Sequence, residues 1–259
     1  MSEACSQDLI DFAATLADAA RPVIRRHFRT AVTIDRKSDN TPVTIADRDA
    51  EAAMRALIAE NYPDHGIIGE ELGPVEGKAD LTWVLDPIDG TKSFISGRPI
   101  FGTLIALVRG GRPILGIIDQ PILDERWIGA DGRATLFNGK EISTRPCGAL
   151  EDAMANSTSP DLFAGADVAK FVTLTDSVWH MQYGGDCYAY AMLATGFLDL
   201  VVEADLKPYD FCALAPIISG AGGLITDWQG QPLTVESDGR IAATGDPTLM
   251  PGVLKLLNR

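Results

Sequence analysis

Histidine and cysteine are scarce in this chain of 259 residues, and neither forms a familiar metal-binding pattern. The three histidines, His27, His65 and His180, lie far apart, so the paired imidazoles of a zinc hydrolase are missing. The four cysteines include no CxxC pair, which favours reduced thiols in or near the core. A zinc site and a disulfide framework are therefore both disfavoured.

Basic residues are outnumbered by acidic ones. Lysine and arginine total 22 against 36 aspartates and glutamates, which gives a net charge of 22 − 36 = −14 with histidine neutral. Such a chain is poorly suited to bind a nucleic-acid backbone or an anionic membrane surface, so we expect neither as a partner. It can still bind phosphate if metal ions reverse the local charge.

Long apolar stretches are also missing. The longest segment without a charged residue, Phe211–Thr226, has 16 residues and contains three glycines and a proline, so it is too short and too broken to span a bilayer. Residues 1–8 lack the basic and apolar regions of a secretory signal, and we expect a cytoplasmic protein. The 46% hydrophobic and 22% charged composition indicates a globular protein of one large or two ordinary domains.

Apolar periodicity predicts helices followed by a sheet in the first half of the chain. Apolar residues recur at helical intervals from Leu9 to Phe28, and a second helical segment runs to about Asn61, with Asp47 in its first turns. Beyond Pro63 the pattern changes to short apolar runs bounded by Gly, Pro and Asp, which predicts strands. The expected strands contain Ile67–Ile68, Trp83–Leu85, Leu104–Val108, Ile114–Ile118 and Trp127–Ile128.

The second half alternates between helical and extended patterns. Helices are expected over about Ala166–Leu174, over Gly185–Thr195 and from Pro208 onward. Strands are expected at Ser177–Met181 and Leu198–Val202. The chain is therefore predicted to be a mixed α/β protein, with an N-terminal lobe of residues 1–150 and a C-terminal lobe of residues 151–259 packed as one catalytic unit.

The segment Trp83–Lys92 carries the clearest chemical signal. A buried strand delivers Asp86 and Asp89 at its end, and Gly90-Thr91 then lets the backbone turn tightly into a helix start. Carboxylates that leave a strand together can share hard cations, and backbone N–H groups at a helix start can hold phosphate oxygens. Taken alone, however, two such aspartates are more often a turn cap and a solvated loop charge.

Two further acidic positions change this interpretation. Glu70 follows the apolar run Ile67–Ile68, and Asp210 lies at a helix start soon after Leu198–Val202. Each alone would be read as a surface charge or a helix N-terminal acid. Their occurrence together with Asp86, in this order along the chain, is much more specific for a site.

These segments together resemble the inositol monophosphatase superfamily, whose members are magnesium-dependent, lithium-sensitive phosphatases. Ordered motifs spread over essentially the whole chain carry the resemblance. They are Lys37–Asp47, Gly69–Glu71, Trp83–Thr91, and Lys207–Asp210 followed by Gly220–Gly223. The resemblance implies a layered αβαβα sandwich of the α/β class and usually a homodimer.

The resemblance also implies a set of metal ligands. Glu70, Asp86 and the backbone carbonyl of Ile88 would hold one magnesium ion. Asp86, Asp89 and Asp210 would hold a second, so that Asp86 bridges the pair. This agrees with the chemistry of the residues, because oxygen ligands select hard cations and magnesium completes its shell with water and substrate phosphate.

Catalytic and phosphate-binding roles follow from the same resemblance. Thr91 and Asp47 would orient and deprotonate a water molecule activated by the metal, with Lys37 close by as an auxiliary charge. Backbone amides at Gly90 and Thr91 would hold the phosphate, and Asp89 would also face the substrate. Two cations can stabilise both ends of an in-line displacement on a phosphomonoester.

Within the superfamily, the sequence is more similar to the bacterial histidinol-phosphate phosphatases. The cues lie in Lys92–Leu107 and Gly184–Asp210. Inositol monophosphatases usually have an Asn and a Trp where this chain has Ser93 and Tyr209. The resemblance therefore implies hydrolysis of L-histidinol phosphate to L-histidinol and phosphate, as a step of histidine biosynthesis.

The resemblance also implies two candidates for substrate contact, because Asp186 and Glu203 lie in the block that faces the site in relatives. Asp186 and Glu203 would favour the amine and imidazole of histidinol, or would accept hydrogen bonds from inositol hydroxyls. Asp186 can equally be a helix N-cap after Gly184-Gly185. The substrate is thus expected to be a small phosphorylated metabolite.

Alternative functions remain open at this point. Within the same class they are an inositol-1-phosphate phosphatase or a broad small-molecule phosphatase, whereas a nucleotide or fructose bisphosphate phosphatase would need an added basic cluster. A non-catalytic metal or phosphate binder would be expected to lose part of the acidic set, which is complete here. A covalent phosphoaspartate is disfavoured because two residues, not one, separate Asp86 from Asp89.

Overall fold

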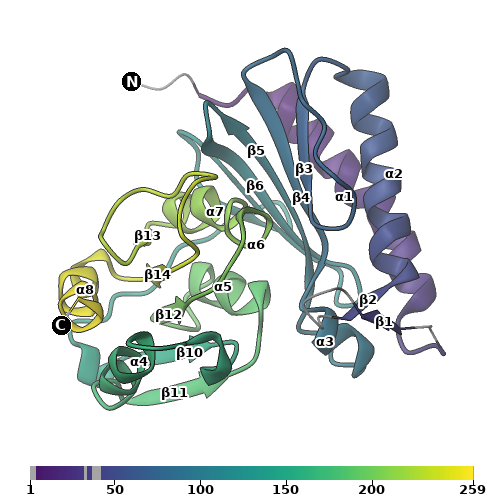
Figure 1. Cartoon of the computed structure of the whole chain (residues 1–259). Helices are drawn as coiled ribbons and strands as arrows, with labels where there is room; N and C mark the ends of the chain where they lie inside the picture. The colour runs from purple at the N-terminus through teal and green to yellow at the C-terminus, as the bar shows by residue number, and fades with distance from the viewer. Residues whose placement is uncertain (1–3, 32–33, 37–41, 259) are drawn as a thin grey trace.

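The computed structural model describes residues 4–31, 34–36 and 42–258, which form two large sheets and a short hairpin (Figure 1). The first large sheet has seven strands in chain order. Its strands are β3 (Gly66–Gly69), β4 (Leu81–Asp89), β5 (Gly102–Arg109), β6 (Arg112–Gln120), β7 (Glu125–Ala130), β8 (Leu136–Phe137) and β9 (Lys140–Glu141). β3 and β4 are parallel, and every later neighbour is antiparallel. The five predicted runs all lie in this sheet.

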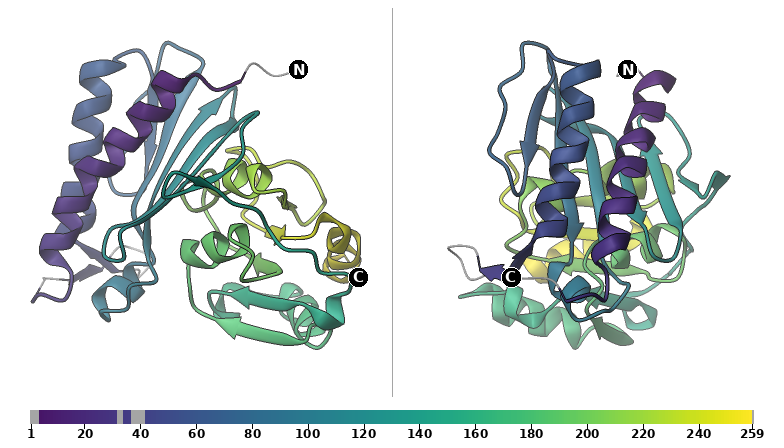
Figure 2. Two further views of the ribbon diagram at one scale, coloured as in Figure 1. Left: turned by 180° about the vertical axis from the view of Figure 1, so that it is seen from behind. Right: turned by 90° about the vertical axis from the view of Figure 1, so that its right-hand side faces the viewer.

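Two long helices cover one face of this sheet (Figures 1 and 2). They are α1 (Gln7–His27) and α2 (Ile45–Asn61), which confirms both predicted helices. Each buries one face, as the recurrence of Ala13, Leu16, Ala20 and Ile24 along α1 illustrates. The hairpin β1 (Ile34–Arg36) and β2 (Pro42–Thr44) leads directly into α2.

The second sheet has five strands in the order β11-β10-β12-β14-β13. They are β10 (Met154–Ser157), β11 (His180–Tyr183), β12 (Leu200–Glu203), β13 (Leu224–Asp227) and β14 (Ile241–Thr244). β10 pairs in parallel with β11 and β12, whereas β14 is antiparallel to β12 and β13. The expected strand at Ser177–Met181 was thus misplaced by a few residues and lies at β11.

Three buried cores define the layers. α5 (Cys187–Ala194) and α7 (Leu214–Gly220) lie between the two sheets and share one core with both. α4 (Asp167–Thr175) and α8 (Met250–Leu257) cover the outer face of the five-stranded sheet. With α1 and α2 on the far side, the order is αβαβα (Figure 2), as predicted.

The helix expected from Pro208 onward is interrupted. It consists of α6 (Pro208–Phe211) and α7, with Cys212 and Ala213 between them. Pro216 lies in the first turn of α7, where a missing N–H is tolerated, so it is compatible with a new helix that starts at Leu214. α6 consists of a single turn, and Asp210 is its third residue.

Among the described residues, no helix combines the length and the apolar character that a bilayer span requires.

Candidate active site

A bulge at the end of β4 places Asp86 and Asp89 on the same side of the sheet. Asp86 pairs with Leu104 and Asp89 with Gly102, so two residues of β4 lie opposite Thr103 alone. On a regular strand, side chains three residues apart point to opposite faces. The extra residue of the bulge turns the side chains of Asp86 and Asp89 to the same face. Two aspartates three residues apart can therefore contribute to one site.

Pro87 occupies the bulge, a position where a residue without an N–H is tolerated in a sheet. Pro87 has no N–H, and prolines in sheets are confined to edges and bulges. Its carbonyl accepts a hydrogen bond of 2.8 Å from Thr103 Oγ1. The N–H of Ile88 donates to Asp86 Oδ1 at 2.9 Å, so the bulge itself orients the Asp86 carboxylate.

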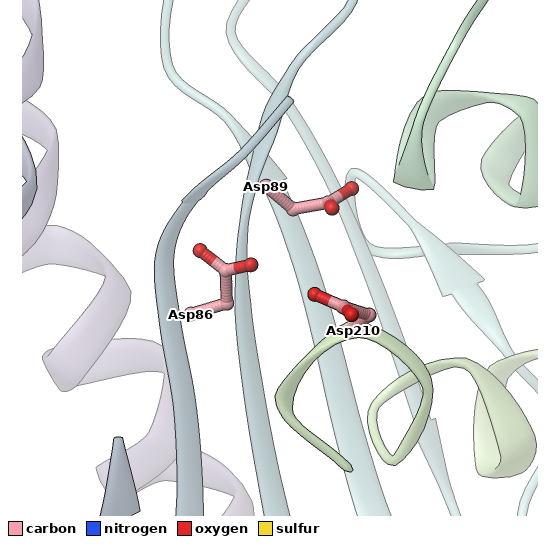
Figure 3. A group of neighbouring side chains, drawn as sticks. All are labelled: Asp86, Asp89 and Asp210. Atoms are coloured by element: carbon pink, nitrogen blue, oxygen red, sulfur yellow. The ribbon is translucent and has the colours of Figure 1, made fainter. Parts of the chain in front are cut away.

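Two more acids reach the same place from other elements. One oxygen each of Asp86, Asp89 and Asp210 lies within 4.8 Å of the other two, and Figure 3 shows the three carboxylates converging. Asp210 is held at the start of α6, where it accepts the N–H of Lys207 at 2.6 Å. Glu70 follows β3, its N–H donates to the carbonyl of Leu85, and its carboxylate lies near enough to Asp86 to act on that group's charge.

The acidic cluster is electrostatically unfavourable without a cation. Burial, and then repulsion by Glu70, Asp89 and Asp210, raises the pKa of Asp86 well above its ordinary value. Burial, followed by the charges of Asp186 and Asp210, does the same to the pKa of Asp89. Burial also raises the pKa of Asp210 to about 7. A divalent cation would relieve this repulsion, and an all-oxygen donor set suits a hard one.

The structure also brings together the predicted pair of the Thr91 hydroxyl and the Asp47 carboxylate. Thr91 begins α3 (Thr91–Ile95), and its Oγ1 lies 3.3 Å from Asp47 Oδ1 and 3.1 Å from the carbonyl of Ile88. Asp47 lies in the first turn of α2, where its other oxygen accepts the N–H and hydroxyl of Thr44 at 2.8 and 2.6 Å. Burial raises the pKa of Asp47. This arrangement leaves Asp47 Oδ1 directed at the hydroxyl of Thr91.

Lys37, the third residue expected to be catalytic, lies outside the described residues, and its role stays a prediction.

Asp186 lies against the proposed phosphate site. Gly90 has φ 89°, in the left-handed region that favours glycine, and a Cβ there would lie 2.7 Å from Asp186 Oδ2. Ser93 Oγ donates to the same oxygen at 3.0 Å. Burial raises the pKa of Asp186, against the opposing effects of Ser93, Lys92 and Arg98.

Asp186 occupies the N-cap position of α5, as the alternative interpretation expected, but it does not cap the helix through its side chain. Within the described part of the chain, that side chain makes no capping hydrogen bond. The carboxylate that accepts the N–H of Cys187 at the start of α5 is that of Asp89. The sequence offered no signal for this contact, because the two residues are 98 positions apart.

Glu203 is buried and is linked to Asp186 through Thr158. It is 2% exposed, and its two oxygens accept the N–H of Thr158 at 2.8 Å and the hydroxyl of Tyr190 at 3.1 Å. Burial raises its pKa from 4.5 to about 7. Its predicted direct contact with substrate stays a prediction, and the structure shows it supporting Thr158, whose hydroxyl in turn accepts the N–H of Asp186.

The buried Glu203 makes stability depend on pH. Its raised pKa stabilises the folded state below about pH 4.5, and this contribution is lost as the pH rises through about 7. In Glu203→Gln, the amide oxygen can accept from Thr158 and the amide nitrogen can donate to Tyr190, so the variant should fold. Its stability relative to the wild type should rise by about 3 kcal/mol between pH 4.5 and 8.

Urea denaturation across this pH range, in chelator and at constant ionic strength, measures that difference. A difference between variant and wild type that does not change with pH would show that Glu203 has an ordinary pKa.

Comparison with known proteins agrees with this geometry. The model of the inositol monophosphatase family matches residues 6–259. The chain is 54% identical over 248 residues to the bifunctional phosphatase IMPL2, chloroplastic, of Arabidopsis thaliana, covering 94% of this chain and 72% of the relative. It is 34% identical over 232 residues to the histidinol-phosphatase of Mycobacterium tuberculosis, covering 87% and 89% of the two chains.

A solved structure supports the same conclusion. An inositol monophosphatase from Zymomonas mobilis superposes with a TM-score of 0.91 at 49% identity, over 98% of both chains. The layered fold, the acidic cluster and the match along nearly the whole sequence point to one relationship. The chain belongs to the inositol monophosphatase family, whose members are metal-dependent phosphatases.

Proposed function

We propose that this protein is a Mg²⁺-dependent phosphatase that hydrolyses L-histidinol phosphate to L-histidinol and phosphate. The observation that carries the proposal is the convergence of Asp86, Asp89 and Asp210 beside the Thr91–Asp47 pair. Magnesium held by these carboxylates and Glu70 would neutralise charge on the phosphoryl oxygens. It would also help the attacking water to lose a proton, and so to act as a nucleophile, at neutral pH.

The protein's own residues orient the reactants. The hydroxyl of Thr91 holds the attacking water, and Asp47 accepts the proton through that hydroxyl, because its Oδ1 lies 3.3 Å from Thr91 Oγ1. The backbone N–H groups of Gly90 and Thr91 bind the phosphate at the turn after β4. Thr44 holds the second oxygen of Asp47, so the carboxylate cannot rotate away from Thr91.

Asp186 supports histidinol as the leaving group. Its carboxylate lies beside Gly90, and a negative charge at this position would attract the ammonium and imidazolium groups of histidinol. Ser93 orients that carboxylate through its hydroxyl. The match to a histidinol-phosphatase at 34% identity is consistent with this choice.

Hydrolysis of inositol phosphates is the second candidate. It is favoured by the 49% identity to the inositol monophosphatase of Zymomonas mobilis and by the bifunctional relative at 54% identity. Since inositol carries no positive charge, Asp186 would contribute much less to its binding. The two candidates therefore differ at this carboxylate.

Phosphate release from L-histidinol phosphate and inositol 1-phosphate, in magnesium and in chelator, tests the proposal. We expect kcat/KM to be at least about 10-fold higher for histidinol phosphate, and chelator to abolish both activities. Asp186→Asn should lower kcat/KM for histidinol phosphate by about 10- to 100-fold, as expected for loss of a charge-assisted hydrogen bond. The same substitution should leave inositol 1-phosphate nearly unchanged.

The outcomes separate substrate from mechanism. A preference for inositol 1-phosphate would contradict the substrate proposal and leave the phosphatase intact. No turnover of either compound in magnesium would favour a non-catalytic metal or phosphate binder. A cytoplasmic location and a homodimer stay predictions from the sequence and its resemblance.

A further inference from the structure

Glu51 makes a buried set of contacts with the loop that carries Glu70. It lies on α2, one turn after Asp47, and is 0% exposed. Its Oε2 accepts the N–H of Glu71 at 2.8 Å, and its Oε1 accepts the N–H of Leu72 at 3.1 Å. Both N–H groups lie just after Glu70. The Glu51 carboxylate thus binds the backbone on the C-terminal side of a proposed metal ligand.

Arg55 completes this arrangement. Its Nε donates to Glu51 Oε1 at 2.7 Å, and its Nη2 donates to the carbonyl of Leu72 at 2.5 Å. The side chains of Glu51 and Arg55 are 0% and 13% exposed, respectively. Glu51 and Arg55 therefore bind both the N–H and the carbonyl of Leu72.

Gly69 shows how closely the loop approaches the carboxylate. A Cβ at this position would lie 2.1 Å from Glu51 Oε1 and 2.6 Å from Arg55 Nη2. Any larger residue would displace the ion pair. Gly69 precedes Glu70 and Glu71 follows it, so the contacts with Glu51 bracket the ligand on both sides.

The position of Glu70 is consequently fixed from two elements. Its own N–H donates to the carbonyl of Leu85 on β4, next to Asp86. From the other side, α2 holds the following residues through Glu51. The same helix holds Asp47 near Thr91, so α2 positions the proposed base and the proposed metal ligand relative to each other.

A buried ion pair is a weak source of stability, because the cost of desolvating both charges offsets their attraction. Packing of this loop alone would not require charged groups. Fixed donors and acceptors do give a loop a single geometry, which a metal site needs, since supporting hydrogen bonds hold its ligands in place.

We propose that Glu51, with Arg55, is a positioning residue that holds Glu70 where it can share a cation with Asp86. The inference deepens the proposed function, because it rests on metal binding by Glu70, and it is independent of the substrate.

Glu51→Gln is the sharpest variant. It keeps the size of the side chain but replaces one oxygen with an NH₂ group. That group must face the N–H of Glu71, or else the donors of Leu72 and Arg55, and in either case donor meets donor. We expect the Mg²⁺ dissociation constant of the full-length, chelator-stripped protein to rise about 10- to 100-fold by titration calorimetry. At saturating Mg²⁺, kcat should recover to within a few-fold of wild type.

Asp199→Asn is the matched control. Asp199 is also a buried carboxylate that accepts an arginine fork, from Arg145 at 2.6 and 2.5 Å, and a backbone N–H, from Met154 at 2.8 Å. It precedes β12, at the opposite end from Glu203. We expect this variant to lose stability and to bind Mg²⁺ like the wild type.

The outcomes decide the proposal. A folded Glu51→Gln protein with Mg²⁺ affinity within two-fold of wild type would overturn it, as would an equal loss of affinity in Asp199→Asn. If Glu51→Gln does not fold, Gly69→Ala takes its place, because the added methyl displaces the same carboxylate; weakened affinity then supports the role and unchanged affinity rejects it. Affinity is measured without substrate, so failure of the histidinol phosphate proposal would be seen separately in the turnover assay.

Discussion

Asp86→Asn should lower kcat/KM by about 10³-fold or more and at the same time make the metal-free protein more stable. The loss in rate follows from the position of Asp86 at the centre of the acidic cluster, where its charge is needed by any cation that the other carboxylates bind. Such a cation supplies several kcal/mol of transition-state stabilisation. The gain in stability follows because asparagine removes a buried charge that three neighbouring acids repel.

Turnover in saturating magnesium and urea denaturation in chelator measure the two effects on the same preparations. Asp205→Asn is a suitable control, because Asp205 is exposed, pairs only with Lys207 in the described part of the chain and has a φ of 62° that asparagine tolerates. It should change neither quantity appreciably. Full activity in Asp86→Asn would remove the proposed site.

Thr91→Val should lower kcat by about 10²- to 10⁴-fold with little change in metal affinity. Valine has nearly the shape of threonine but cannot hold a water molecule or pass its proton to Asp47, and general base catalysis typically contributes a factor of this size. The substitution removes no predicted metal ligand: Thr91 donates to Asp47 and to the carbonyl of Ile88, and loss of its hydrogen bond leaves that carbonyl in place to bind a cation.

Thr91→Ser keeps the hydroxyl and should retain most of the activity. Steady-state kinetics at saturating magnesium and calorimetric titration of Mg²⁺ for both variants give the necessary comparison. Comparable activity of the valine and serine variants would show that the hydroxyl has no part in the reaction, and the base would then have to be sought elsewhere.

The acids of the site could be predicted from the sequence, but the way in which they meet could not. The order of Glu70, Asp86, Asp89 and Asp210 along the chain was sufficient to suggest a common site. Their convergence depends on the bulge in β4, which appears in the sequence only as a proline between two aspartates. A strand without the bulge would have directed Asp86 and Asp89 to opposite faces.

Other features of the structure could not be predicted from the sequence, either because the strands are very short or because the contacts join segments far apart in the chain. The strands β10, β13 and β14 have four residues each, which is too short for an alternating pattern to stand out. The supporting contacts of Ser93 and Glu51 connect segments about 93 and 20 residues apart. Local periodicity carries no information about such partners.

The origin of the four acids has a consequence for folding. Asp86 and Asp89 belong to the seven-stranded sheet and Glu70 directly follows its strand β3, whereas Asp210 comes from α6, on the segment that follows β12 of the five-stranded sheet. A shared ion would therefore act as a crosslink between distant parts of the chain, and removing it would leave like charges pushing those parts away from each other. Occupancy of the ion would then raise the free energy of unfolding of the molecule that both parts share, because a ligand bound only by the folded state adds its binding free energy to that of folding.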